Sequence, residues 1–181
     1  SSYWVLLITT SLLIAIASWG LNVVSGYAGQ VNLGHGVFVC IGTYVSSVLG
    51  GVATTSVIGY ELDMIIWLPL SGLAATLIGI ILSPVSARLK GLNLGLVTLA
   101  LVFIGSHFFS NLKFITGGAG LGRKAAKLTF MGIDLEAGIT VGNFILEKND
   151  FIYFFSLILS ILLGLGVKNI TRSKIGRAFS A

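Results

Sequence analysis

Charge is what this sequence lacks most: residues 1–60 contain no Asp, Glu, Lys or Arg, and the first charged residue is Glu61. Charged residues make up only 9% of the 181-residue chain, whereas soluble globular proteins carry about 25%. The mean hydropathy is +1.00. The composition therefore excludes an ordinary soluble domain and indicates an integral membrane protein.

Cysteine and histidine are also scarce. The lone Cys40 excludes a disulfide within the chain, and its apolar surroundings predict a buried, inert thiol. The two histidines, His35 and His107, have no partners at the spacing of metal ligands. A metal site is therefore not expected, and an intramembrane enzyme using His35 as a base would lack a nucleophile or a metal cluster.

The net charge of +5 comes from basic residues scattered over loops, not from a stripe that could bind nucleic acid. Lys and Arg accumulate in the cytoplasmic loops of membrane proteins. We therefore place the turn at 86–91 and the tail after residue 167 in the cytoplasm, and the segments 52–62 and 113–150 outside. The basic residues that decide this orientation are Arg88, Lys90, Lys168, Arg172, Lys174 and Arg177.

Five apolar segments predict an all-α integral membrane protein, a polytopic bundle of about five spans. A span needs roughly 20 mostly apolar residues, and the second segment is short unless the residues before it help to cross the bilayer. Residues 1–181 are expected to form a single transmembrane domain. Because the chain begins without Met and ends directly after a basic stretch, we expect a fragment of a larger protein. The predicted spans are 3–24, 37–52, 62–85, 92–112 and 151–167.

A glycine-rich break separates the first two spans: Ser25–Gly36 reads SGYAGQVNLGHG. Glycine allows backbone conformations that unwind a helix, and unwound backbone inside a membrane is tolerated where it lines a cavity. The alternative is a plain loop at the membrane surface. His35 could be a proton relay or substrate contact, or could simply bond to backbone. The candidate pathway residues are Gly26, Gly29, Gln30, Asn32, Gly34 and His35.

A second glycine cluster, TGGAGLG at Thr116–Gly122, superficially suggests a phosphate loop. The motif GxxxxGK[ST] requires Lys followed by Ser or Thr, and Arg123 and Lys124 occupy those places. Nucleotide binding is therefore rejected. We expect instead a tight external turn, at Thr116, Gly117 and Gly118, that caps the fourth span and could contact a partner or the mouth of a pathway.

Two weaker patterns concern packing and the tail. Small residues recur every four positions at Gly42, Ser46 and Gly50 and again at Ser71, Ala75 and Gly79, which favours close helix packing. The basic tail Thr171–Ala181 is typical either of an interfacial helix on anionic lipid or of a short helix that docks in a partner.

Four stretches of the sequence resemble one known family. The stretches are GLNVVSGYAGQVNLGHGVF (Gly20–Phe38), ARLKGLNLGLVTLA (Ala87–Ala100), TGGAGLG and RSKIGRAFSA (Arg172–Ala181). Together they resemble the permease subunits of branched-chain amino acid ABC importers of the Liv type, and the M-like subunit more than the H-like one. Permeases for urea and short-chain amides look similar.

The resemblance implies a subunit of the bacterial inner membrane that performs no bond chemistry. Branched-chain or other hydrophobic amino acids would pass along the segment Gly26–Gly36. The coupling segment would contact the ATPases through Arg172, Lys174, Gly176, Arg177 and Ala178. The implied partners are a second permease, two cytoplasmic ATPases that hold ATP and Mg, and a periplasmic binding protein, so no cofactor is expected in this chain. The alternatives are a urea or amide permease and a passive channel-like subunit.

Overall fold

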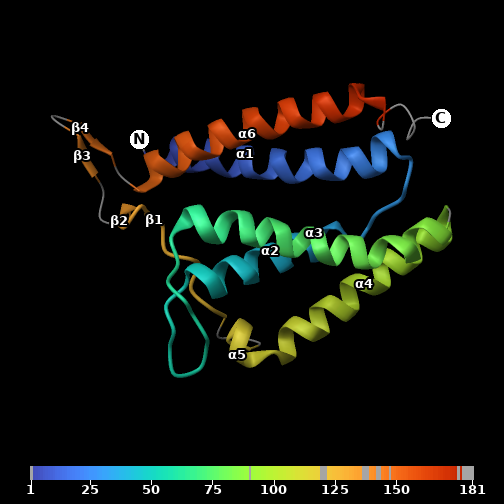
Figure 1. Cartoon of the computed structure of the whole chain (residues 1–181), viewed down its shortest axis with the longest axis horizontal. Coiled ribbons are helices and arrows are strands. Elements are labelled where there is room, and N and C mark those ends of the chain that lie inside the picture. Colours follow the sequence, from blue (N-terminus) through green and yellow to red (C-terminus); the bar gives the residue numbers. More distant parts are fainter. Residues whose placement is uncertain are drawn as a thin grey trace. The chain divides into compact units, whose positions relative to one another are not determined.

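The computed structural model describes residues 2–89, 91–118, 122–135, 139–141, 144–146, 148–174 and 176. The described chain is mostly helical and divides into two compact units (Figure 1). The first unit comprises Ser1–Asn32 and Ala137–Ala181, and the second comprises Leu33–Glu136.

The first unit pairs two long helices from opposite ends of the sequence. Its elements are α1 (Ser2–Asn22), the π-helical turn η1 (Val23–Tyr27), the hairpin of β3 (Ile139–Val141) and β4 (Phe144–Leu146), and α6 (Lys148–Arg172). Helices α1 and α6 run alongside each other. Small polar residues of the two helices are buried, namely Thr9, Ser156 and Ser160. A Cβ at Gly164 of α6 would lie 3.0 Å from the Trp19 ring of α1, so a glycine lets the two helices approach closely.

The second unit holds three apolar helices with short elements at their ends. It consists of α2 (His35–Gly50), α3 (Met64–Arg88), α4 (Leu92–Asn111), the one-turn α5 (Lys113–Thr116), and a hairpin of β1 (Thr129–Phe130) and β2 (Ile133–Asp134). Helix α2 packs against α3 and also contacts α4. Met131 and Gly132 connect the two strands, both with positive φ, as a two-residue hairpin turn requires.

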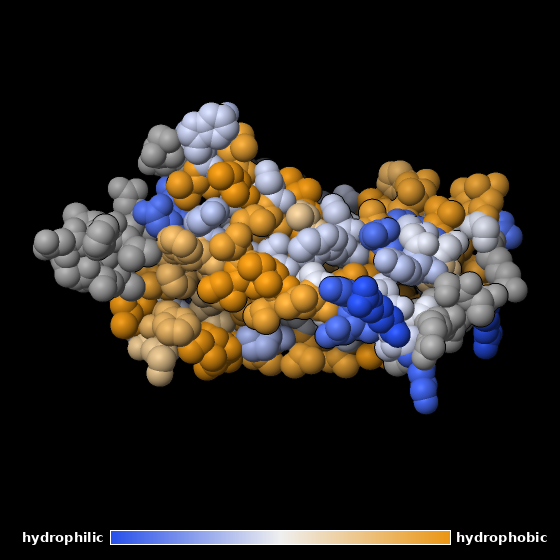
Figure 2. Space-filling model, turned by 90° about the horizontal axis from the view of Figure 1, so that it is seen from above, coloured by the Kyte–Doolittle hydropathy of each residue, from blue (hydrophilic) through white to orange (hydrophobic). Residues whose placement is uncertain are grey.

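Four helices among the described residues are long and apolar enough to cross a membrane: Tyr3–Tyr27, Met64–Ser86, Leu92–Asn111 and Lys148–Arg172. Many of their large hydrophobic side chains lie at the surface, as Figure 2 shows in orange. This distribution suits helices whose outer faces contact lipid. The prediction of an all-α membrane protein is therefore confirmed.

Helix α2 accounts for the fifth predicted span. It has 16 residues, or about 24 Å at 1.5 Å per residue, less than the ~30 Å thickness of the hydrocarbon core. It begins at His35 instead of Val37 and ends at Gly50 instead of Val52. The last predicted span is longer than expected, because α6 extends over Lys148–Arg172.

The two segments predicted to face outward contact each other within the second unit. Ile58 N–H donates to the Phe114 carbonyl oxygen over 3.1 Å, and Lys127 Nζ lies 2.9 Å from Glu61 Oε2. Two segments on the same side of a membrane can contact each other in this way, so the contact agrees with placing both on one side. The side itself, and the joint action of both units as one domain over residues 1–181, stay predictions.

The predicted small-residue stripes contribute unequally to packing. An ideal Cβ at Gly50 would lie 2.5 Å from Trp67 Cδ1 and 2.8 Å from the Ala126 Cβ, whereas a Cβ at Gly42 would meet no atom within 4 Å. Gly50 is therefore the glycine of its stripe that close packing requires. Ser47, which the stripe does not include, is buried, and Ser46 is half-buried.

We expect Gly50→Ala to lower the melting temperature of the protein in detergent. The added methyl group would press on the buried Trp67 ring, and overpacking of this kind costs about 1–3 kcal/mol. The control is Gly42→Ala in the same helix, where the methyl group has room and alanine favours the helix by up to about 1 kcal/mol. Equal decreases in the two variants would contradict this account of the α2–α3 contact.

Candidate functional site

The glycine-rich break begins with a widened helical turn. Ala28 N–H donates to the Val23 carbonyl over 3.2 Å, and Gln30 N–H donates to the Val24 carbonyl over 3.2 Å. Such π-helical turns are rare and are often found at functional sites. Gly26 therefore belongs to η1 and not to unwound backbone, which is a correction to the predicted start of the break. The Asn22 side chain lies against Gly26, where a Cβ would be 3.2 Å from Asn22 Cγ.

The helical conformation ends after η1, and Gly29 is where the backbone turns. Its φ of +61° lies in the left-handed region, which L side chains adopt only with strain. Gly29 and Gln30 are exposed, and Asn32 is half-buried. These three candidates belong to the first unit.

The rest of the break belongs to the second unit, where Thr98 of α4 fixes it. Leu33 N–H donates to Thr98 Oγ1 over 3.1 Å, and this hydroxyl donates to the Gly95 carbonyl over 3.0 Å. Gly34 is buried, and a Cβ there would lie 3.0 Å from the Thr98 carbonyl oxygen. Thr98 therefore sets where α2 begins. Sequence reasoning missed this residue, although it lies in one of the stretches that carry the family resemblance.

A cavity of about 670 Å³ lies between α2, α4 and the turn formed by Thr116, Gly117 and Gly118, here called the TGG turn. Its lining joins two motifs that are far apart in the sequence, since Gly36 ends the break and Thr116 and Gly118 form the turn. Its lining combines hydroxyl groups with apolar side chains. The lining residues are Gly36, Val37, Cys40, Tyr44, Val102, Gly105, Ser106, Phe109, Ser110, Thr116, Gly118 and Gly122. The expectation of a buried Cys40 was wrong, because this residue is exposed and lines the cavity.

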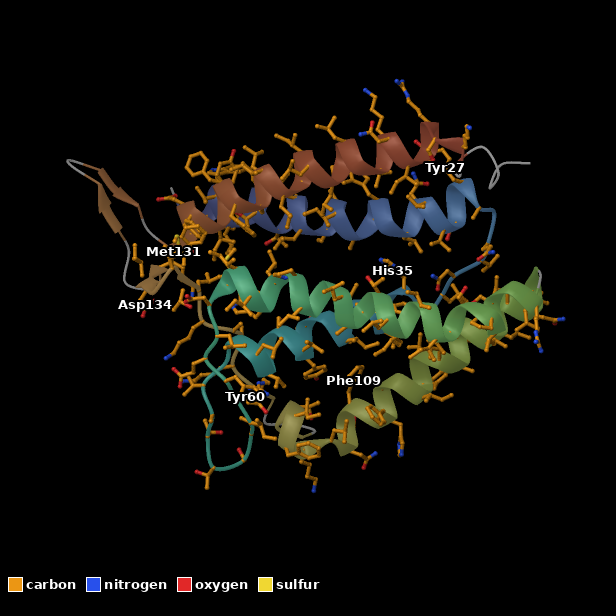
Figure 3. The ribbon with its side chains drawn as sticks, viewed as in Figure 1. Tyr27, His35, Tyr60, Phe109, Met131 and Asp134 are labelled. Atoms are coloured by element: carbon orange, nitrogen blue, oxygen red, sulfur yellow. The ribbon has the colours of Figure 1, made fainter. Side chains whose placement is uncertain are left out.

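A second cavity, of about 470 Å³, adjoins the first and has an almost wholly apolar lining from α2, α3, α4 and α5. The two cavities share four lining residues at the contact of α2 with α4: Val37, Tyr44, Gly105 and Phe109. The Tyr44 and Phe109 rings stack with their centroids 4.8 Å apart, and Figure 3 shows Phe109 on α4. This aromatic pair therefore forms part of the wall between the cavities.

The TGG turn caps the C-terminal end of α4 through the Thr116 side chain and the two glycines that follow it. Thr116 is 2% exposed, and its hydroxyl donates toward the carbonyl oxygens of Phe109 (2.8 Å) and Leu112 (3.0 Å) while it accepts from Gly118 N–H (3.1 Å). Gly117 and Gly118 have φ values of +81° and +82°, so both positions favour glycine. The hydroxyl of Thr116 is thus occupied in holding the turn.

The structure brings only some of the predicted site residues together. Gly34 and His35 directly precede the cavity-lining Gly36, but neither they nor Gly26, Gly29, Gln30 and Asn32 line the 670 Å³ cavity. Tyr44, Ser106 and Ser110 line the cavity but were not expected from the sequence. Their helical spacing with Gly36, Cys40 and Val102 is a signal, but it becomes informative only once α2 and α4 are known to face each other.

The predicted coupling segment starts inside a helix, because Arg172 is the last residue of α6. After it, Gly176 N–H donates to Ser173 Oγ over 3.3 Å, and buried Gly176 packs on the carbonyl oxygens of Ile170 and Thr171. Gly176 therefore lies against the last turn of α6. Lys174 is exposed, while Arg177 and Ala178 lie outside the described residues.

Among the residues that the structure describes, no three His, Cys, Asp or Glu side chains group so that they could hold a metal ion. The 670 Å³ cavity is lined by hydroxyls, a thiol, backbone and apolar groups, and its lining contains no Asp, Glu, Lys, Arg or His. Such a lining can bind a small polar or amphipathic solute weakly through hydrogen bonds.

Comparison with known proteins shows which sequences this chain resembles. Residues 3–181 match the family described as "branched-chain amino acid transport system / permease component". The chain is similar to the high-affinity branched-chain amino acid transport system permease protein LivM of Salmonella typhimurium and of Escherichia coli. The identities are 31% and 32% over 185 aligned positions, which cover 96% of this chain and 42% of each relative. No solved structure matches.

The chain thus spans less than half the length of the curated relatives that it matches. The match nevertheless includes both glycine motifs, all the described helices and the tail. The chain therefore belongs to the family of permease components of branched-chain amino acid transport systems.

Proposed function

We propose that this chain lines the translocation pathway of an ABC importer for branched-chain or other hydrophobic amino acids. The observation that carries the proposal is the 670 Å³ cavity, which the end of the glycine-rich break and the TGG turn both line. The name of the family and the names of the two relatives support the class of substrate.

The lining of the cavity suits a hydrophobic amino acid. Hydroxyls of Tyr44, Ser106 and Ser110 can bond to an ammonium or a carboxylate group, and Val102 and Phe109 offer apolar surface to an aliphatic side chain. The apolar surface favours such a substrate over urea or a short amide, which lack a large hydrophobic part. Because the lining contains no charged side chain, binding would be weak, which permits release on the other side.

The energy for transport would come from partner subunits. Proton- and sodium-coupled carriers rely on buried charged residues within the membrane, and no predicted span of this chain has Asp, Glu, Lys or Arg in its apolar middle. We therefore propose a second permease, two cytoplasmic ATPases that hold ATP and Mg, and a periplasmic binding protein as partners in the inner membrane of a bacterium. The coupling segment, which follows the end of α6, would contact an ATPase.

We expect Ser106→Phe to reduce the uptake of radiolabelled leucine by at least about tenfold in cells that carry the complete transporter. The phenyl ring would occupy the cavity, so the solute would lose its space there. The matched control is Ala100→Phe, which adds the same ring to an exposed position of α4 outside this lining. Uptake by Ser106→Phe at the rate of Ala100→Phe, with equal amounts of both proteins in the membrane, would refute the pathway role of the cavity.

A second prediction concerns the coupling segment. Arg177→Glu should reduce the co-purification of the ATPase subunits, because a reversed charge would disrupt docking of this segment on its partner. The control is Lys168→Glu in the exposed last part of α6, which should retain the ATPases. If Arg177→Glu retained them as well, the tail would contact anionic lipid instead of a partner.

Deletion of Lys174–Ala181 separates the ABC permease from a passive channel. An ABC permease should lose ATP-dependent uptake as well as its ATPases. A channel should still conduct solute down its gradient, as measured by uptake at high external concentration without ATP.

A further inference from the structure

Arg123, which follows the TGG turn, joins two separate segments of the second unit. Its Nη1 donates to the Ile115 carbonyl oxygen over 2.8 Å, and its Nη2 donates to the Ile58 carbonyl oxygen over 2.5 Å. Ile115 belongs to α5, whereas Ile58 lies in the connection between α2 and α3. One planar guanidinium group therefore bridges elements that are 57 residues apart in the sequence.

The groups around Arg123 accommodate its positive charge. Burial lowers the pKa of the guanidinium, although arginine stays charged at any physiological pH. A partly buried charge is stable only when hydrogen bonds replace its water, and the two carbonyl oxygens supply such bonds. A Cβ at Gly51 would lie 3.0 Å from Nη2, so the glycine leaves room for the group.

Other backbone contacts extend this junction. Ile58 N–H donates to the Phe114 carbonyl oxygen over 3.1 Å, and Lys127 N–H donates to the Gly50 carbonyl oxygen over 2.8 Å. The chain from Arg123 to Lys127 therefore follows the α2–α3 connection. On the other side of Arg123, Thr116, Gly118 and Gly122 line the 670 Å³ cavity.

A second link across the same junction is weaker. Lys127 and Glu61 form an ion pair at 2.9 Å, and their side chains are 39% and 49% exposed. Ion pairs exposed to this degree contribute little to stability. The half-buried Arg123 is therefore the side chain that holds the junction most firmly.

We infer that Arg123 is a positioning residue that fixes the TGG turn, and with it one wall of the cavity, against the connection between α2 and α3. The inference rests on the proposed function in so far as this cavity is the transport pathway. Arg123 itself is not among the residues that line the cavity. It acts through the backbone at Ile58 and Ile115, so its loss should change access to the cavity and not only the stability of the protein.

Cys40 provides a probe of this access, because it is exposed and lines the cavity. In membranes that contain the complete transporter, we expect Arg123→Gln to accelerate modification of Cys40 by a water-soluble maleimide. The acceleration should be on the order of tenfold, because two hydrogen bonds of a charged donor are lost. A Cys40→Ser variant measures labelling at all other sites.

Two further variants make the test specific. Glu61→Gln removes the exposed ion pair at the same junction and should leave the Cys40 labelling rate within about twofold of the original. Arg123→Lys keeps the charge but replaces the two-pronged guanidinium by a single ammonium group. The rate of Cys40 labelling in this variant should therefore lie between those of the original protein and Arg123→Gln. An unchanged Cys40 rate in Arg123→Gln would overturn the inference. If this variant did not accumulate in the membrane, an unchanged rate in Arg123→Lys would overturn it instead.

These outcomes are separable from a failure of the proposed function. If Ser106→Phe blocks uptake while Arg123→Gln leaves Cys40 labelling unchanged, the pathway stands and only the positioning role is lost. If Ser106→Phe transports normally, the cavity is not the pathway, whereas faster labelling in Arg123→Gln would still support its role in holding the cavity wall.

Discussion

The need to satisfy backbone hydrogen bonds without water governs this structure. In hydrocarbon an unpaired N–H or C=O group costs several kcal/mol, so a chain can leave the helical conformation only where the protein supplies partners. The segment between η1 and α2, which we propose to lie within the membrane, has such partners of two kinds. The π-helical turn satisfies Ala28 and Gln30 from within, and the Thr98 hydroxyl of α4 accepts from Leu33 N–H. The break and α4 consequently depend on each other.

The same solvent explains where the small residues lie. Lipid solvates large apolar side chains as well as a protein interior does, so packing between helices falls to small residues and to hydroxyls that bond to their own helix. Ser156 and Thr9 are buried in this way, each donating to a carbonyl of its own helix. At the contact of α2 with α4, Gly105 packs against Val37. The stacked rings of Tyr44 and Phe109 at the same contact line both cavities.

A cavity whose lining has hydroxyls and no charged side chain suits the proposed pathway for an amino acid. In that proposed pathway, strong binding of an amino acid would slow its release, and ionic partners within the membrane would add a large desolvation cost. The family to which the chain belongs accords with this design. The TGG turn contributes in a different way from the break, because its Thr116 hydroxyl is engaged in closing α4 and its glycines supply backbone to the cavity lining.

The membrane class, the apolar helices, the position of the break and the family could all be predicted from local composition and motifs. Three other features became visible only in the folded chain: Gly36 and the TGG turn meet at one cavity, Cys40 is exposed there, and Arg123 joins α5 to the α2–α3 connection. The physical reason is that a membrane helix is apolar on the side facing lipid and on the side facing protein. The hydrophobic periodicity of the sequence therefore hardly distinguishes these two sides. Which helix faces pack together depends on contacts between residues that are distant in the chain.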